Sequence, residues 1–400
     1  MTHNPTRHAL PRALRHALVG CLVLALAALT ACTSEPPPPP PLPAGCPVDA
    51  GQALTLVVGA RMGSPRPTLP VEVEGLVETA ARGERKVQVV RVDGQPTVAL
   101  AADVRITGKN ETQREKQVAE LVGKVKAFVE QLEPKQAEAD VLGALAEAAR
   151  VTPEGGTVVL VDSGLATAGA VSFREEGMWG ANPGEVAAFL AAQRLLPALT
   201  GRSVLLVGLG GTADPQPALN EDLRGRVGKL WREVVVKAGA TCAGELGIPS
   251  RRDAFPTTVP VTVVNLPEEP KPVPCGTTKL EDSGSVGFVP DTADLRDPSA
   301  ADRTLQSLAG VVSSGAQRVT LVGNTAGGGP AAGHVELSTR RAEAVKAILV
   351  RLGVPADRIA TRGDGNSGPY HENDLGPDGV LIPAAAARNR SVVVELSCPQ

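Results

Sequence analysis

Residues 322–345 read VGNTAGGGPAAGHVELSTRRAEAV, and this stretch, with the motifs after it, decides the fold of the C-terminal part. A Gly-rich segment precedes Leu337-Ser338-Thr339-Arg340-Arg341-Ala342, which opens a helical pattern. Gly363-Asp364-Gly365 follows, and Asn389-Arg390-Ser391-Val392-Val393-Val394 then enters an apolar run that ends at Leu396. A turn, a helix and terminal strands in this order predict an α+β domain.

The order and spacing of these motifs resembles the OmpA/MotB C-terminal domain, the peptidoglycan-anchoring module of bacterial envelopes. That family usually has a Thr-Asp pair before the turn, an Asn shortly before Leu-Ser, and Asn-Arg-Arg near the end. The corresponding positions here are Thr325-Ala326, His334 and Asn389-Arg390-Ser391. The resemblance implies a β-α-β-α-β-β domain with a mixed sheet.

The individual elements of this domain are expected at definite places. Val286–Leu295 resembles the first strand of the family and the residues after it. The helices are expected at Ala301–Val312 and Ser338–Leu352. The remaining strands are expected at Arg318–Gly323, Arg358–Arg362 and Ser391–Leu396.

The resemblance also implies a binding site for the peptidoglycan stem peptide. The family binds zwitterionic diaminopimelate through an Arg for the carboxylate and an Asp for the ammonium group. Arg341 supplies the first, but Ala326 cannot supply the second, so weak binding is expected; Asn324 or Asp364 is a candidate for partial compensation. The candidate ligand-binding residues are Arg341, Thr325, Asn324, Gly329, Asn389 and Arg390.

The N-terminus carries the signals of an exported lipoprotein. Arg7, Arg12 and Arg15 precede an apolar run at residues 17–29, which is short for a membrane span. The run ends in Leu29-Thr30-Ala31-Cys32, which resembles a lipobox with Cys32 as the lipidated residue. The alternative is an ordinary signal peptide with a coincidental Cys. The expected location is exported, lipid-anchored to the cell membrane or outer membrane, and facing the cell wall.

The sequence divides into five segments. We expect a lipoprotein signal peptide at 1–31 and a Pro-rich tether at 32–50, where residues 36–43 contain seven Pro and favour polyproline II. An α/β domain at 51–266, a Pro-rich linker at 267–279 and the OmpA-like domain at 280–400 follow.

Composition excludes several classes of function. The net charge is −3 over 400 residues, and removal of residues 1–31, with three Arg and no acid, makes it −6, so no nucleic-acid partner is expected. Only His334 and His371 remain after that removal, so neither a multi-His metal site nor a Ser-His-acid triad is expected. No pair of carboxylates is singled out for glycan cleavage. The protein is expected not to be an enzyme.

Four cysteines remain for disulfides in an oxidising compartment. Four cysteines allow three pairings. Cys46 and Cys242 bracket the first expected domain, and Cys275 and Cys398 bracket the second, so Cys46–Cys242 and Cys275–Cys398 are the favoured pairs.

Residues 51–266 alternate between strand and helix patterns, which predicts a doubly wound sheet with helices on both faces. The expected strands are Ala53–Val58, Val87–Val92, Thr157–Val161, Ser203–Val207 and Val259–Val264. The expected helices are Val71–Ala81, Glu111–Glu130, Ala139–Arg150, Glu185–Leu196 and Leu219–Ala238.

The order of these elements resembles a von Willebrand factor A-like domain, and a generic Rossmann-like sheet is the rival. That family often binds a divalent ion through Asp-x-Ser-x-Ser, a Thr and an Asp. Gly59, Arg61 and Gly63 occupy the first motif here, Ala139 occupies the Thr position, and only Asp162 is retained. One carboxylate does not hold a hard cation, and Arg61 brings positive charge to the same place, so no metal is expected.

Gly208-Leu209-Gly210-Gly211-Thr212-Ala213 matches a loose dinucleotide-binding fingerprint. Pro215 and Pro217 delay the next helix, so its N-terminus cannot open on the loop as phosphate binding requires. No cofactor is expected.

The sequence as a whole predicts a lipid-anchored envelope protein that links membrane to cell wall. Its expected partners are the peptidoglycan stem peptide, bound weakly, a membrane through the lipid anchor, and an unknown protein that binds the N-terminal domain. The alternative is a protein-interaction adaptor whose OmpA-like domain no longer binds peptidoglycan.

Overall fold

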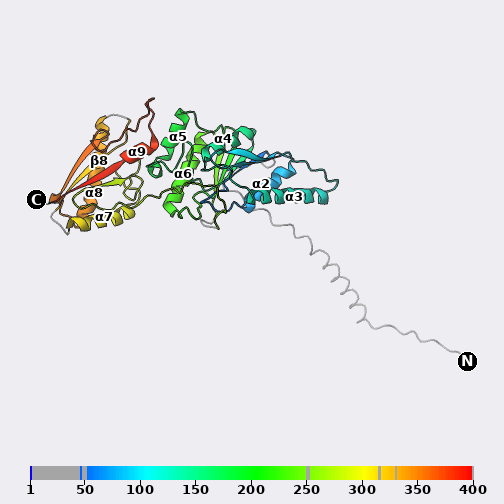
Figure 1. The fold of residues 1–400 in the computed structure, drawn as a ribbon, viewed down its shortest axis with the longest axis horizontal. Helices are drawn as coiled ribbons and strands as arrows, with labels where there is room; N and C mark the ends of the chain where they lie inside the picture. Colours follow the sequence, from blue (N-terminus) through cyan, green and yellow to red (C-terminus); the bar gives the residue numbers. More distant parts are fainter. Residues whose placement is uncertain (2–45, 47–51, 249–252, 314–316, 329–330, 399–400) are drawn as a thin grey trace. The chain divides into compact units, whose positions relative to one another are not determined.

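The computed structural model describes Met1, Cys46 and residues 52–248, 253–313, 317–328 and 331–398 (Figure 1). The proposed lipidation site Cys32 and the Pro-rich segment at 36–43 lie outside the described residues, as does Gly329 of the candidate binding site. Residues Pro41–Gln400 form one unit by their internal contacts. Within the described part of the chain, no helix has the length and apolar character needed to cross a membrane.

The N-terminal domain is built on a six-stranded sheet in the order β3-β2-β1-β4-β5-β6. Neighbouring strands are parallel, except that β3 runs antiparallel to β2. The central strands are continuous apolar runs, as expected for strands covered on both faces. The strands are β1 (Leu54–Val58), β2 (Val87–Arg91), β3 (Thr97–Ala102), β4 (Thr157–Val161), β5 (Ser203–Val207) and β6 (Cys242–Leu246).

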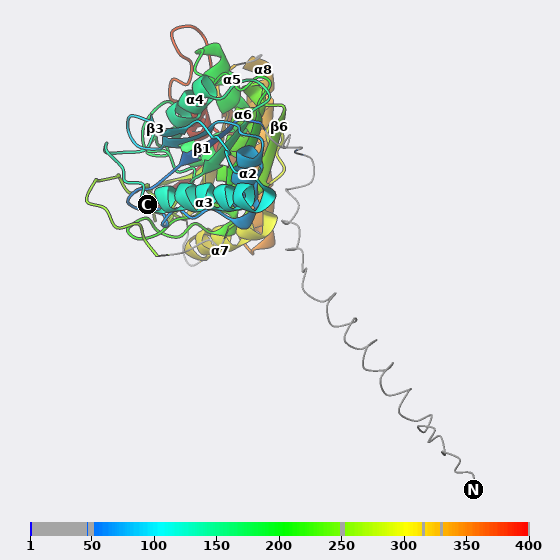
Figure 2. The same ribbon diagram turned by 90° about the vertical axis from the view of Figure 1, so that its right-hand side faces the viewer.

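Helices cover both faces of this sheet, and Figure 2 shows α3 on the opposite side of β1 from α4 and α5. Alternate residues of a strand point to opposite faces. Leu56 and Val58 therefore join the core under α2 (Val71–Arg82) and α3 (Glu111–Glu130). Val57 joins the core on the other face, under α4 (Val141–Val151), α5 (Pro183–Ala192) and α6 (Glu221–Lys237).

Side-chain caps fix where these helices begin. Asn110, Asp140, Asn182 and Asn220 each accept a hydrogen bond from a backbone N–H in the first turn of the helix that follows. Such caps satisfy donors that have no partner inside the helix. Pro183 occupies the first turn of α5, where its missing N–H costs nothing.

The C-terminal domain is a four-stranded mixed sheet with helices packed on one face. The strand order is β7-β10-β8-β9; β10 is antiparallel to β7 and β8, and β8 is parallel to β9. Leu305, Val345 and Leu349 of the helices pack on Leu321 and Val392 of the sheet. The strands are β7 (Thr277–Glu281), β8 (Arg318–Asn324), β9 (Ile359–Gly365) and β10 (Ser391–Ser397), and the helices are α7 (Pro298–Ser313), α8 (Ala331–Arg351) and α9 (Pro383–Asn389). Single 3-10 turns, η1 (Met178–Gly180) and η2 (Ala356–Arg358), complete the elements of the two domains.

The predicted combination of an α/β domain and an α+β domain is confirmed, but two expected strands are wrong. Val259–Val264 forms no strand, because Pro260 lacks the N–H that a sheet ladder needs. The edge position is taken by β6, whose sequence CAGEL carries a weak strand signal. The unpredicted β3 forms the opposite edge.

The first strand of the C-terminal domain is β7, not Val286–Leu295. β7 begins at Thr277, inside the range expected as linker. Val286–Leu295 instead forms a loop, with a turn closed by the Thr292 N–H on the Val289 carbonyl oxygen at 3.1 Å and one bridge between Phe288 and Leu295. Pro290 and Asp291 are typical turn residues, which explains why the strand pattern is interrupted here.

The described residues contain two disulfides, Cys46–Cys242 and Cys275–Cys398, the pairs favoured from the sequence. Their Cα atoms lie 5.2 and 5.0 Å apart, within the usual range for disulfides. The first ties the segment before β1 to the edge strand β6. The second links the residue before β7 to the residue after β10, so each disulfide crosslinks one domain.

Candidate functional site

Asn324 and Thr325 end β8 and begin the turn that the family resemblance singles out. Both are buried. The Thr325 N–H donates to the Gly365 carbonyl oxygen at 2.8 Å, and Thr325 Oγ1 lies 3.0 Å from His334 Nδ1. The Asn324 amide donates to the Val322 carbonyl oxygen at 3.1 Å. These contacts hold the turn against β9 and the start of α8.

A buried carboxylate from a distant loop lies against this turn. Asp374 Oδ2 accepts the Gly327 N–H at 2.7 Å and the Asn389 Nδ2 at 2.9 Å. A Cβ at Gly327 would lie 2.5 Å from Asp374 Oδ1, so the close approach needs glycine. Asp374 is only 1% exposed. The turn therefore has no carboxylate at Ala326, but it packs against the carboxylate of Asp374. Asp374 is not part of the family motif.

Asn389 positions the same carboxylate. Its Oδ1 accepts the Glu372 N–H at 2.9 Å, and its Nδ2 donates to the Glu372 carbonyl oxygen at 2.8 Å and to Asp374. The side chain is fully buried. Asp364, considered as a replacement acid, pairs with Arg362 at 3.2 Å.

Arg341 lies on α8 and is 2% exposed. Its Nε donates to the Thr292 carbonyl oxygen at 2.9 Å, and its guanidinium lies 5.0 Å from the centre of the Phe288 ring, within cation–π range. Among the described residues, Arg341 has no carboxylate within salt-bridge distance and no acceptor for its two terminal nitrogens. Burial lowers the pKa of Arg341, and the charge of Asp282 opposes that shift. The guanidinium is thus oriented through Nε with two donors left for a ligand.

Arg390 and Arg296 extend the positive charge around Arg341. Arg390 pairs with Glu185 of α5. Arg296 donates to the Asp282 carbonyl oxygen and lies 3.3 Å from Asp282 Oδ1. Burial lowers the pKa of Arg296 as well. Arg296, Asp282 and Asp374 were missed from the sequence because they stand outside the recognised motifs.

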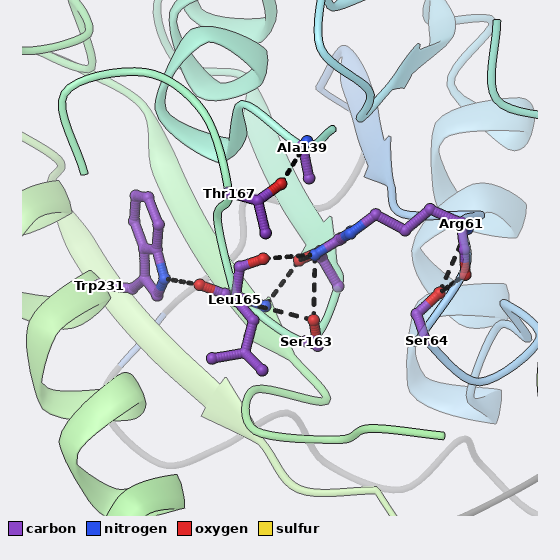
Figure 3. Close-up of polar contacts among 9 residues, drawn as sticks. Arg61, Ser64, Ala139, Ser163, Leu165, Thr167 and Trp231 are labelled. Atoms are coloured by element: carbon purple, nitrogen blue, oxygen red, sulfur yellow. Dashed lines mark hydrogen bonds and ion pairs between the residues drawn. The ribbon is translucent and has the colours of Figure 1, made fainter. Parts of the chain in front are cut away.

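A second polar cluster lies at the carboxyl ends of β1 and β4 in the N-terminal domain (Figure 3). These strands are parallel neighbours, so the residues that follow them meet at one edge of the sheet. The Arg61 guanidinium pairs with both oxygens of Asp162 and also donates to Ser163 Oγ at 3.0 Å and the Leu165 carbonyl oxygen at 3.2 Å. The side chains of Arg61 and Asp162 are 2% and 0% exposed.

Further hydrogen bonds fix the backbone around the Arg61–Asp162 ion pair. Ser64 Oγ donates to the Arg61 carbonyl oxygen at 2.7 Å, and Trp231 Nε1 donates to the Gly164 carbonyl oxygen at 2.8 Å. A Cβ at Gly59 would lie 1.7 Å from Asp162 Oδ2, so the ion pair fills the space that a side chain at 59 would need. The cation beside Asp162 is therefore part of the protein itself.

The degenerate ion-site motif and the Gly-rich loop at Gly208–Ala213, at which no metal and no cofactor are expected, both lie in the same domain. Among the described residues, no group of three or more His, Cys, Asp or Glu side chains is arranged to hold a metal ion. After the Gly208–Ala213 loop, the next helix begins only at Glu221. The Gly210 N–H donates to the Ser163 carbonyl oxygen at 2.7 Å, so the loop packs against the Arg61–Asp162 cluster.

Comparison with known proteins bears on the C-terminal part of the chain. Residues 287–378 match the model of the OmpA family. The C-terminal domain is OmpA-like. Outer membrane protein A of Bordetella avium is 38% identical over 80 residues, which are 20% of this chain and 38% of that protein. The photosystem I P700 chlorophyll a apoprotein A2 of Gloeobacter violaceus is 34% identical over 125 residues, 31% of this chain and 14% of that protein. The chain thus spans well under half the length of either relative.

Two solved structures are each similar to about a third of the chain. The peptidoglycan-associated lipoprotein from Burkholderia pseudomallei is 25% identical, covering 30% of this chain and 89% of that one, with a TM-score of 0.25. The periplasmic domain of Helicobacter pylori MotB is 16% identical, covering 33% of this chain and 82% of that one, also with a TM-score of 0.25.

Proposed function

We propose that this chain is a non-enzymatic cell-envelope protein whose OmpA-like domain binds peptidoglycan weakly through Arg341. The single observation that carries the proposal is the state of Arg341, which lies in the middle of α8. It is buried, oriented by Thr292, and without a carboxylate partner among the described residues. A buried guanidinium without a counter-charge is costly unless an anion binds it.

The diaminopimelate of a stem peptide offers the matching group. Its carboxylate can accept two parallel N–H bonds from the terminal nitrogens of Arg341. Its ammonium group needs an acid, and Ala326 supplies none. Asp374 is too deeply buried and too fully bonded to serve well. The expected result is weak binding, dominated by the carboxylate.

Co-sedimentation of the mature protein with purified, diaminopimelate-containing sacculi tests this function. We expect a saturable bound fraction that increases with sacculus concentration. Sacculi stripped of stem peptides by an amidase provide the control and should retain less protein. Equal sedimentation with both preparations would place the contact on glycan and remove Arg341 from its proposed role.

A substitution at Ala326 should supply the missing carboxylate for the ammonium group of diaminopimelate. Ala326→Asp is expected to tighten sacculus binding about tenfold or more, since a hydrogen bond to a charged group contributes about 1.5–3 kcal/mol. Ala326→Asn has nearly the same shape without the charge and should change binding little. If both variants bind as the wild type does, the missing carboxylate is not the defect.

An alternative function as a protein-interaction adaptor is favoured by the state of the binding turn. The turn has Ala326 where the family has an acid, and the side chains of Asn324, Thr325 and Asn389 are buried and bonded within the protein. These features suit a domain retained as a protein-interaction adaptor after loss of its ligand. Absence of sedimentation by the wild type, with none restored by Ala326→Asp, would favour the adaptor.

The N-terminal domain completes the proposal as a von Willebrand A-like module that binds a protein partner without a metal ion. The support is the Arg61 guanidinium on Asp162, the one retained acid of the family's ion site. The same pair argues against a nucleotide-binding Rossmann domain, because the neighbouring Gly208–Ala213 loop packs on it rather than opening on a helix.

Lipidation of Cys32 would attach these domains to a membrane, after cleavage of residues 1–31 and through the tether at 32–50. The support is the sequence Leu29-Thr30-Ala31-Cys32, together with two disulfides that fit an oxidising compartment. Metabolic labelling with a palmitate analogue should mark the wild type and not Cys32→Ser. Equal labelling of the two proteins would reject the lipid anchor and favour an ordinary signal peptide.

A further inference from the structure

A pocket of about 240 Å³ lies beside Arg390, with walls from both folded domains of the Pro41–Gln400 unit. The α/β domain contributes Trp179 of η1 and Arg226 of α6. The OmpA-like domain contributes Asp282, Arg296 and Arg390. Pockets for whole small-molecule ligands measure about 300–1,000 Å³, so this one suits the end of a peptide.

The pocket carries an excess of positive charge. Two acids line it, Asp222 and Asp282, against four bases. Arg226 pairs with Asp222 at 2.9 Å, and Arg296 lies 3.3 Å from Asp282 Oδ1. The charge of Asp282 also acts on Arg341, and burial lowers the pKa of both Arg296 and Arg341. More cations than carboxylates line the pocket, and partly desolvated cations favour entry of an anion. The basic residues of the lining are Arg226, Lys229, Arg296 and Arg390.

The cations are held in place before any ligand arrives. Arg226 Nη1 donates to the Trp179 carbonyl oxygen at 2.9 Å and to the Ser283 carbonyl oxygen at 3.0 Å, which joins the two domains at the pocket. Arg390 is fixed by its ion pair with Glu185 of the α/β domain. Such preorganisation lowers the entropy lost on binding.

The opposite wall is apolar and aromatic. The Trp179 and Phe173 rings pack at a tilt of 51° with centroids 4.7 Å apart, and both line the pocket with Met178. Trp179 Nε1 is already used, donating to the Asn265 carbonyl oxygen at 2.9 Å. The wall therefore offers a surface for aliphatic carbon atoms beside the cationic rim.

We propose that this pocket binds a carboxylate-bearing end of the peptidoglycan stem peptide, so that the α/β domain supplies one wall of a composite site. The inference rests on the proposed function of Arg341, which does not line the pocket but interacts electrostatically with its Asp282, Arg296 and Arg390. Its consequence is specific to this chain. The N-terminal domain takes part in ligand recognition through Arg226 and Lys229, in addition to any protein partner.

Calorimetric titration of the mature protein with soluble, diaminopimelate-containing muropeptides tests the composite site. Arg226→Gln should weaken binding about tenfold or more, as for a lost charge-assisted bond. Lys229 is exposed, so Lys229→Gln should weaken binding only about two- to fivefold and leave the fold intact. Arg232→Gln and Lys237→Gln, at exposed positions on the same helix, are the matched controls and should bind as the wild type does.

The outcomes distinguish the composite site from peptidoglycan binding through Arg341, on which it rests. Loss of affinity in the Arg226 and Lys229 variants, with both controls unchanged, supports the composite site. If Arg341→Ala abolishes binding while Arg226→Gln and Lys229→Gln bind as the wild type does, the composite site is wrong and the proposed function stands. If the wild type binds no muropeptide, both are overturned.

Discussion

Replacing Asp162 by alanine is expected to lower the free energy of unfolding by about 3–5 kcal/mol. The change leaves the Arg61 guanidinium, 2% exposed, without its carboxylate. It also removes the acceptor of the Gly164 N–H, which lies 2.6 Å from Asp162 Oδ1. A buried charge that loses its partner is among the few single changes with an effect this large. Urea denaturation followed by circular dichroism measures it.

The double variant Arg61→Met/Asp162→Leu is the control for this prediction. Both charges are removed together, so no unpaired ion remains, and replacement of a buried ion pair by apolar residues is often neutral or stabilising. We expect the double variant to be more stable than Asp162→Ala. If the two variants lose the same stability, the cost comes from packing around Gly59 and not from the charge.

Arg341→Ala is expected to reduce muropeptide affinity about ten- to a hundredfold, the value of a charge-assisted hydrogen bond of 1.5–3 kcal/mol. Arg341→Lys keeps the charge but loses the planar pair of donors, so it should recover only part of the affinity. Arg340→Ala is the matched control. Arg340 is the neighbouring residue, is exposed, and among the described residues pairs with Glu336 on its own helix.

Folding must be separated from binding in this comparison, because Arg341 also packs on Phe288 and holds Thr292. Thermal unfolding of each variant supplies that check. A variant that retains the melting temperature of the wild type but loses affinity identifies a ligand contact. Equal affinity in the Arg341→Ala and Arg340→Ala proteins would remove Arg341 from the binding site.

Much of the fold could be predicted because local and tertiary signals agree. LTLVV, TVVLV and SVLLV are short β-branched runs, and each forms a central parallel strand. The predicted limits of α3 coincide with the observed ones, helped by the Asn110 cap. The edge strands β3 and β6 were missed because their sequences, TVALAA and CAGEL, contain Ala, Gly and Glu, which are depleted in strands.

The candidate site could be predicted only where it follows a motif. Arg341 was singled out from the signature helix, and Arg61 from its position in the degenerate Asp-x-Ser-x-Ser motif. Asp374 was missed because its place is set by an irregular loop between β9 and α9, and no periodic pattern determines the path of such a loop. The charges around Asp282 were missed for a related reason, since they come together only when the loop after β7 folds against Arg296.

Recognition of the stem peptide by this domain is tested by displacement of the wild-type protein from sacculi with free meso-diaminopimelate. The bound fraction should fall as the free amino acid is added, whereas lysine, which lacks the second carboxylate, should displace much less at equal concentration. Arg341→Ala protein should show little bound fraction to displace. A bound fraction that neither diaminopimelate nor lysine reduces would contradict recognition of the stem peptide by this domain.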